Sequence, residues 1–380
     1  MTQRNDLARD AWKALVWMLS ALGLLATACA EPAATSKPVQ VKTESIPAIL
    51  PLTGPSADLG RSVEQGMRLA EEDLSAAGKP YRLAVEDSQG LAERALTAYA
   101  ASRAANPSRV VLSWMSSAGR ALAPVTRSDK TLLFVGAALS DLTGDDGMVV
   151  RVWANATQIG QKMGDLASRH GYKRVAVLYV NDDYGRSVAG AFQAVLEHQG
   201  SRVVAREPLD PAQTDYRTPC ERMKRTRPDA LYMPAYGGAY TIGLRQIREV
   251  FGSEMPIIAD FTLLSSFTLP KVGAAAEGVL VPATYLDLDP RPTEQARAFA
   301  DRYQARYHLE ADFNAGLGYM MVAIAAHALD AKTTGADLAS AIRGQTFQGP
   351  IGELRYDRKN DCTLPIEIAR IQGGRARKAS

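Results

Sequence analysis

The sequence predicts an α/β protein made of two doubly wound, Rossmann-like lobes in tandem. From Ile46 onward, short apolar runs alternate with longer amphipathic stretches, which is typical of a parallel sheet with helical crossovers. The same rhythm then repeats in a second unit. A chain of 380 residues is long enough for two domains of ordinary size.

The first unit carries four expected strands and three expected helices. The strands are residues 46–50, 81–86, 109–112 and 132–135. The helices between them are residues 62–77, 92–105 and 118–126. Each strand is followed by a helical stretch, so this unit predicts one complete parallel sheet.

The second unit has five expected strands, and the chain then changes character. The strands are residues 175–179, 202–206, 230–233, 257–259 and 279–281, and the helices begin near Thr157, Tyr184, Thr214, Ala239 and Leu264. Long helices at 293–308 and 314–331 and a late strand pair at 351–356 and 366–371 follow. We expect the helices to cover the first lobe and the last strands to rejoin the second. The domains are then discontinuous, with lobe 1 at 45–149 and 284–345 and lobe 2 at 150–283 and 346–376.

The first 28 residues predict a signal peptide. Arg4, Arg9 and Lys13 precede an apolar run at 14–26, which is too short to span a bilayer as a helix. Small residues then lead into Cys29, as in a lipobox, so we expect a lipid-anchored protein of the bacterial cell envelope or periplasm. The alternative is simple cleavage after Ala28. Residues 29–44 are the expected tether.

Composition and motifs argue against several other classes. The 44 basic and 41 acidic residues nearly balance, so nucleic acid is not an expected partner. Cys220 and Cys362 lack metal-ligand spacing, and we expect two buried thiols rather than a disulfide. No histidine follows a strand, and no phosphate loop, dinucleotide fingerprint or nucleophile elbow occurs. We therefore expect neither an enzyme nor a metal or cofactor site.

Six segments of the chain match, in their order and spacing, those of a known protein family. They are residues 51–56 with Gly60, 113–124, 136–143, 181–185, 236–238 and 347–352 with Leu354, Tyr356 and Asp357. On these segments the chain resembles the type I periplasmic binding proteins of the leucine/isoleucine/valine-binding kind. The resemblance implies two lobes, joined by three crossover segments, that close like a hinge on a solute.

The same resemblance implies the substrate-binding lipoprotein of an ABC transporter. Its expected partners are a membrane permease and an amino acid of the branched-chain type, or a related small carboxylate or amide. We expect a monomer that meets the membrane only through its lipid anchor. The alternative is a sensory receptor of the same fold, because hinge closure on a solute serves both tasks.

Three serines in the first lobe are candidate ligand contacts. Ser56 lies in a turn that leads from the first strand into a helix, where capping is the competing interpretation. Ser116 and Ser117 stand before the helix that follows the third strand, where a hydroxyl and free N–H groups can hold a carboxylate. The resemblance implies that one of this pair contacts the ligand's carboxylate, and we favour Ser117.

The loop after the fourth strand, residues 136–143, is a second candidate ligand contact in this lobe. The resemblance implies that its backbone carbonyl and a hydroxyl hold the amino and carboxylate ends of the ligand. Ala137 and Ala138 match the backbone positions. The hydroxyl position falls on Leu139 or Ser140, and we choose Ser140.

The second lobe offers two tyrosines and one carboxylate. Tyr184 opens a helix, and Tyr236 precedes a glycine pair that implies close backbone approach; the resemblance implies that both tyrosines cover the ligand. Asp260 ends the strand at 257–259 and would pair with a ligand ammonium. If Phe261 faces the cleft instead, a carboxylate without an amine, an amide or an aromatic acid becomes the better ligand.

Overall fold

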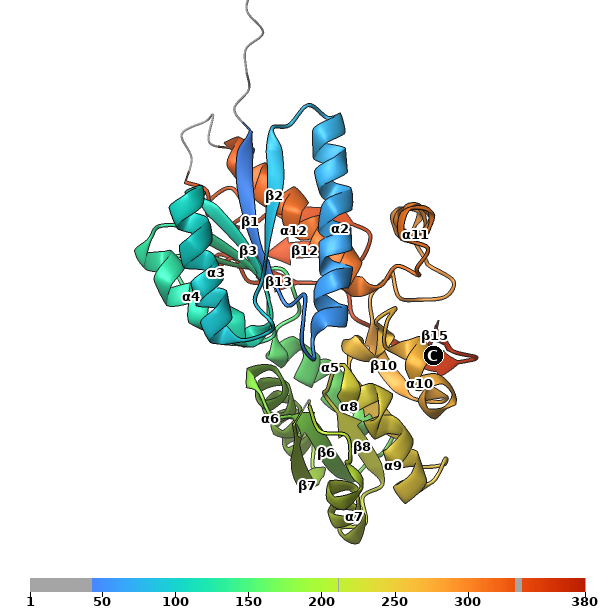
Figure 1. Ribbon diagram of the computed structural model, residues 1–380. Coiled ribbons are helices and arrows are strands. Elements are labelled where there is room, and N and C mark those ends of the chain that lie inside the picture. Colours follow the sequence, from blue (N-terminus) through green and yellow to red (C-terminus); the bar gives the residue numbers. More distant parts are fainter. Residues whose placement is uncertain (1–42, 211, 332–336, 380) are drawn as a thin grey trace, which may run out of the picture. The chain divides into compact units, whose positions relative to one another are not determined.

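The computed structural model describes residues 43–210, 212–331 and 337–379. The predicted signal peptide, Cys29 and the tether up to residue 42 lie outside the described residues. The described body contains two parallel sheets flanked by helices, which confirms the predicted α/β fold (Figure 1).

The first lobe has a five-stranded sheet in which all pairings are parallel. In order across the sheet, its strands are β2 (Tyr81–Asp87), β1 (Glu44–Leu50), β3 (Val110–Trp114), β4 (Leu132–Gly136) and β5 (Val149–Arg151). Its first three helices are α2 (Ala57–Ala76), α3 (Ala92–Ala105) and α4 (Ser116–Ser128). The prediction omitted β5, a strand of three residues.

The second lobe has a seven-stranded sheet whose first five strands in the chain pair in parallel. In order, its strands are β15 (Arg375–Lys378), β14 (Glu367–Gln372), β10 (Leu280–Ala283), β9 (Ile257–Ala259), β8 (Ala230–Met233), β6 (Arg174–Val180) and β7 (Arg202–Leu209). Its α-helices are α5 (Ala156–Arg169), α6 (Asp183–His198), α7 (Arg217–Arg225), α8 (Gly238–Thr241), α9 (Gly243–Phe251) and α10 (Leu269–Val272). Two short 3-10 helices, η1 (Phe261–Leu264) and η2 (Gly273–Ala276), complete it.

The tail of the chain returns to both lobes. Helix α12 (Phe313–Asp330) packs along α2, and α11 (Glu294–Tyr307) precedes it. The chain then forms a separate small sheet of β11 (Thr346–Gly349), β12 (Gly352–Tyr356) and β13 (Cys362–Thr363) before β14 joins the second sheet. The two strands that were predicted to pair with each other are β12 and β14, and they lie in different sheets. Each pairs with a short strand that the sequence pattern did not reveal. The predicted residue limits of the lobes stay a prediction.

Close contact between α2 and α12 depends on glycine. A Cβ atom at Gly66 would overlap the carbonyl oxygen of Ala315, and one at Gly318 would overlap that of Val63. Because neither backbone can yield, the two helices reach this separation only with glycine at both positions. This contact fixes the N-terminal end of α12, which carries part of the site described below.

Three further findings concern the described residues. Cys220 and Cys362 are free thiols, and both are buried. Across 43–379, apart from the gaps given above, no group of three or more potential metal ligands comes together. None of the helices in this part of the chain has the length and apolarity needed to cross a membrane.

Candidate functional site

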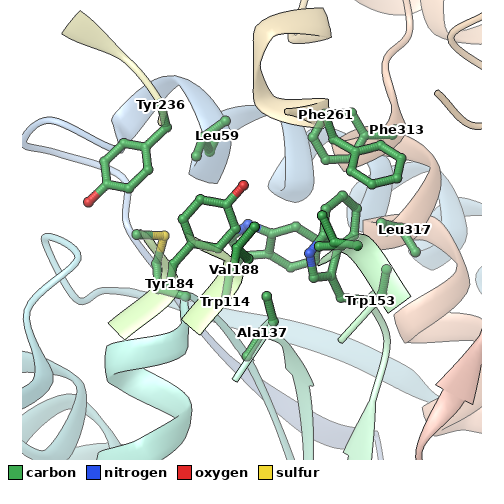
Figure 2. Packing of buried hydrophobic residues seen from close by; sticks show 14 of the residues in the cluster. Leu59, Trp114, Ala137, Trp153, Tyr184, Val188, Tyr236, Phe261, Phe313 and Leu317 are labelled. Carbon is green, nitrogen blue, oxygen red and sulfur yellow. The ribbon is translucent and has the colours of Figure 1, made fainter. Parts of the chain in front are cut away.

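A small cavity lies where the carboxyl ends of strands from both sheets meet, the position at which open α/β sheets bind ligands. The space open to the centre of a water-sized sphere is about 40 Å³. Its lining residues are Leu59, Trp114, Met115, Ser116, Gly136, Ala137, Ala138, Trp153, Tyr184, Tyr236, Thr262, Phe313 and Asn314. Figure 2 shows Tyr184 and Tyr236 on one side of this cluster and Trp153 with Phe313 on the other.

The end of β3 supplies one wall of the cavity. The indole ring of Trp114 lies directly on the backbone of Gly136, where a Cβ atom would overlap it. Met115 follows with φ of 91°, a backbone region that residues with side chains rarely adopt. This turn starts α4 at Ser116, so the free N–H groups of the first helical turn lie beside the cavity.

The backbone carbonyls of the next loop are already hydrogen-bonded. The guanidinium of Arg151, which is fully buried, donates to the carbonyl oxygens of Ala137 and, at 2.7 Å, Leu139. The carbonyl oxygen of Ala138 accepts from the N–H of Ala156 at 2.6 Å. Arg151 also pairs with Asp361 at 2.7 Å, which balances its charge. The carbonyls of Ala137, Ala138 and Leu139 therefore each already accept a hydrogen bond.

Two tyrosines from the second lobe form the facing wall. The Tyr184 hydroxyl donates to Asp260 at 2.6 Å, and the Tyr236 hydroxyl donates to Asp182 at 2.7 Å. Burial and the adjacent carboxylates hold the pKa of both phenols well above the usual value, so both remain neutral donors. After Tyr236 the chain passes close to the first lobe, because a Cβ atom at Gly237 would lie 2.6 Å from the Pro55 carbonyl oxygen.

Asp260 lies behind the cavity wall rather than in it. Its carboxylate accepts the Tyr184 hydroxyl and, at 2.7 Å, the N–H of Phe261, where it caps η1. Burial raises the pKa of Asp260 to about 6, while these two hydrogen bonds oppose the rise. Phe261 is also behind the wall, and its ring packs against Trp153 at 4.9 Å between centroids.

The third wall comes from the start of α12. Asp312 caps the helix by accepting the N–H of Ala315 at 3.1 Å, and it also accepts the Ser62 hydroxyl at 2.5 Å. Asp287 accepts the N–H of Phe313 at 2.9 Å. These bonds fix Phe313, whose ring stacks with Trp153 at 4.9 Å, and Asn314 at the cavity.

The structure brings five of the nine residues predicted to contact ligand to the cavity, and four lie elsewhere. Those that line it are Ser116, Ala137, Ala138, Tyr184 and Tyr236; those that do not are Ser56, Ser117, Ser140 and Asp260. Their roles in binding stay predictions.

The four outlying residues have other surroundings. Ser56 is buried at the start of α2, where its side chain makes no capping hydrogen bond but lies beside the hydroxyl of Tyr236. Ser117 does not line the cavity and donates to the carbonyl oxygen of Gly90 at 3.3 Å. Ser140 is exposed, 3.3 Å from the hydroxyl of Thr157. Asp260 is occupied by Tyr184 and Phe261, as described above.

The sequence did not predict most of the aromatic lining. Trp114 lies within the segment 113–124, in which only Ser116 and Ser117 were predicted to contact ligand. Trp153 follows β5, which the pattern did not reveal. Phe313 and Asn314 begin a helix in the tail, whereas the predicted contacts all follow strands of the two units. A tryptophan at or near the carboxyl end of a buried strand was the available signal.

The fold and the site together define a class of protein: a two-lobe receptor that encloses a small molecule between parallel sheets. Comparison with known families agrees, since residues 43–375 match the family described as periplasmic binding protein. The chain belongs to this family of solute-binding proteins, which are not enzymes.

Among similar proteins, one is the leucine-, isoleucine-, valine-, threonine- and alanine-binding protein of Pseudomonas aeruginosa, 27% identical over 202 residues. That match covers 52% of this chain and only about half, 52%, of the relative.

Two solved structures show the same fold. A solute-binding protein of an ABC transporter from Rhodopseudomonas palustris BisB5, in complex with 3,4-dihydroxybenzoic acid, has a TM-score of 0.80 at 21% identity and covers 89% of this chain and 96% of its own. The leucine-binding protein of Thermotoga maritima MSB8 has a TM-score of 0.80 at 22% identity, covering 89% and 98%. At these identities the likeness concerns the fold alone.

Proposed function

We propose that this protein is the solute receptor of an ABC importer and that it binds a small aromatic carboxylate without an amino group. Five aromatic side chains line the cavity: Trp114, Trp153, Tyr184, Tyr236 and Phe313. Aromatic walls favour a flat ring, through edge and offset contacts that add to the burial of apolar surface. The small volume excludes peptides and polymers.

The start of α4 is the proposed carboxylate site. Ser116 faces the cavity, and the first N–H groups of this 13-residue helix have no intrahelical acceptor. Such a helix end attracts anions without a cationic side chain. The Ser116 hydroxyl oxygen accepts the N–H of Ala138 at 3.2 Å, which leaves its proton free to donate to a carboxylate.

The observation that carries the proposal is that no carboxylate lines the cavity to balance the charge of an ammonium. Asp260 is taken up by Tyr184 and Phe261, and the carbonyls of the loop after β4 already accept hydrogen bonds. None of the residues lining this cavity is acidic. A buried ammonium without a counter-charge loses several kcal/mol, so an amine-free acid is preferred by a large factor.

A branched-chain amino acid is the second candidate. The curated relative from Pseudomonas aeruginosa is named for such ligands, and Asp260 stands one side chain behind the cavity. For this ligand, Tyr184 would have to release Asp260 and expose its carboxylate. The first candidate needs no such rearrangement.

A thermal-shift panel separates these candidates. The ligands are benzoate, 3,4-dihydroxybenzoate, leucine and isoleucine, each at the same set of concentrations. A ligand at a hundred times its Kd stabilises the fold by about 2.7 kcal/mol, which is a shift of a few degrees. We expect shifts with the aromatic acids and none with the amino acids at equal concentration; shifts with leucine or isoleucine alone would reject the proposal.

Export, a lipid anchor at Cys29 and docking on a membrane permease are part of the same proposal. They are supported by the sequence pattern of the first 29 residues and by membership of a periplasmic family. Mass spectrometry of the protein purified from bacterial membranes tests the anchor, because an unmodified N-terminus at Cys29 or Ala30 contradicts it.

A further inference from the structure

Asn314 has an unusual position at the cavity. Its side chain is only 1% exposed and lies among the lining residues. Within the described part of the chain, neither its amide nitrogen nor its amide oxygen has a hydrogen-bond partner. Buried side-chain amides are nearly always hydrogen-bonded, so two unpaired atoms on one residue require an explanation.

The backbone that carries Asn314 is held in place. Asp312 and Asp287 hold it on either side through the bonds to Ala315 and Phe313. Close packing at Gly66 blocks a shift of the helix toward α2. The amide therefore lines the cavity, where it can accept one hydrogen bond and donate another.

We propose that Asn314 recognises a hydroxyl group on the ring of the bound solute. This inference rests on the proposed function and narrows it from aromatic carboxylates to hydroxylated ones. The hydroxyl donates to the amide oxygen and accepts from the amide nitrogen, so one small group satisfies both atoms. Asn314 is then a specificity-determining residue.

Other polar groups fit this amide less well. A carboxylate only accepts, and it would leave the amide oxygen unpaired; an ammonium only donates, and it would leave the nitrogen unpaired. A carboxamide satisfies both atoms but is larger than a hydroxyl, and the cavity offers only about 40 Å³ of space for water centres. A site that hydrogen-bonds a substrate hydroxyl discriminates strongly against the analogue that lacks it, because its own groups are then left unpaired.

Titration calorimetry with benzoate, 3-hydroxybenzoate and 4-hydroxybenzoate tests this inference on the wild type and on Asn314→Leu. In the wild type, at least one hydroxybenzoate should bind about ten-fold tighter than benzoate. In Asn314→Leu, which replaces the amide by an apolar group of similar shape, this preference should vanish while benzoate affinity changes less than about three-fold. Asn106→Leu, which removes an amide at an exposed position outside the cavity, is the matched control and should keep the wild-type preference.

The ligand-free melting temperature gives a second readout. Removing two unpaired buried polar atoms should leave Asn314→Leu at least as stable as the wild type. Asn314→Ala serves as the second variant if the leucine side chain cannot be accommodated. The inference is overturned if either variant keeps the wild-type preference for a hydroxybenzoate over benzoate. It is also overturned if the wild type binds benzoate more tightly than both hydroxybenzoates. Both outcomes leave the proposed function intact. A wild type that binds none of the three acids rejects both.

Discussion

At the scale of single residues, Asp260 decides which chemistry the cavity can bind. An acidic side chain at this strand end favours an amino acid when it faces the ligand, and that was the expectation from sequence. The structure instead uses the carboxylate to orient Tyr184, which does face the cavity. In the structure, Asp260 therefore supports Tyr184 in the cavity wall and does not itself line the cavity.

Asp260→Asn tests this assignment through stability. Burial raises the pKa of Asp260 to about 6, whereas an unfolded aspartate titrates near 3.9. The folded state therefore binds this proton more tightly, and the contribution of Asp260 to the free energy of unfolding falls as the pH rises from about 4 to 6. The asparagine variant lacks this titration, so its melting temperature relative to that of the wild type should rise from pH 4 to pH 7. Because the amide keeps only one of the two oxygens that accept from Tyr184 and Phe261, the variant also carries a loss of stability that does not change with pH.

Binding to the same variant provides the complementary readout. We expect Asp260→Asn to bind benzoate within about three-fold of the wild type, because its amide oxygen can still accept the Tyr184 hydroxyl. The opposite pH dependence, in which the wild type becomes more stable relative to Asp260→Asn as the pH rises, would contradict this assignment. It would show that the surroundings of Asp260 stabilise its ionised form. Loss of benzoate binding with an intact fold would place Asp260 in the ligand contact.

The lining residues that the sequence predicted all follow strands with a clear apolar pattern. Lining residues elsewhere in the chain were not predicted. Ser116, Ala137, Ala138, Tyr184 and Tyr236 all follow strands that show a clear apolar pattern, and all reach the cavity. Orientation was not predictable, since neither the choice between Ser116 and Ser117 nor that between Asp260 and Phe261 is encoded in local periodicity. Phe313 and Asn314 depend on how a distant helix packs, which only the tertiary structure reveals.

At the scale of elements, the contact between α2 and α12 builds the third wall. These helices are far apart in sequence, yet their glycines allow backbone-to-backbone contact. The sequence predicted both helices and the return of the tail to the first lobe. It did not predict the separate sheet of β11 to β13, because strands of two to five residues with mixed burial carry little periodic signal.

Gly66→Ala should disrupt this contact. The added methyl group overlaps the Ala315 carbonyl oxygen, and overpacking of this kind typically costs about 1–3 kcal/mol of stability. It should also weaken ligand binding, because it displaces Asn314 and Phe313. Urea denaturation followed by circular dichroism measures the first effect, and calorimetry the second.

Gly190→Ala, in the interior of α6, is the matched control. Nothing lies within 4 Å of its added methyl group, so it should stabilise the protein by about 0.5–1 kcal/mol through helix propensity alone. Equal effects of the two substitutions would contradict the role assigned to the contact between α2 and α12.

At the scale of the whole body, the first and second lobes meet at few polar points outside the cavity. Arg120 pairs with Asp183 at 3.1 Å, and Lys271 pairs with Asp58 at 3.0 Å. Both cations are about half exposed, so each pair contributes at most about 1 kcal/mol. These exposed pairs therefore contribute little to holding the two lobes together.

The most direct test of this account is titration calorimetry of the purified wild-type protein with leucine and with 4-methylpentanoate. These two ligands have the same carbon skeleton and carboxylate and differ only in the amino group. Because the cavity offers a carboxylate site at α4 but no counter-charge for an ammonium, the amine-free acid should bind at least ten-fold tighter. Tighter binding of leucine would contradict the account and would mean that Tyr184 releases Asp260 to pair with the ligand.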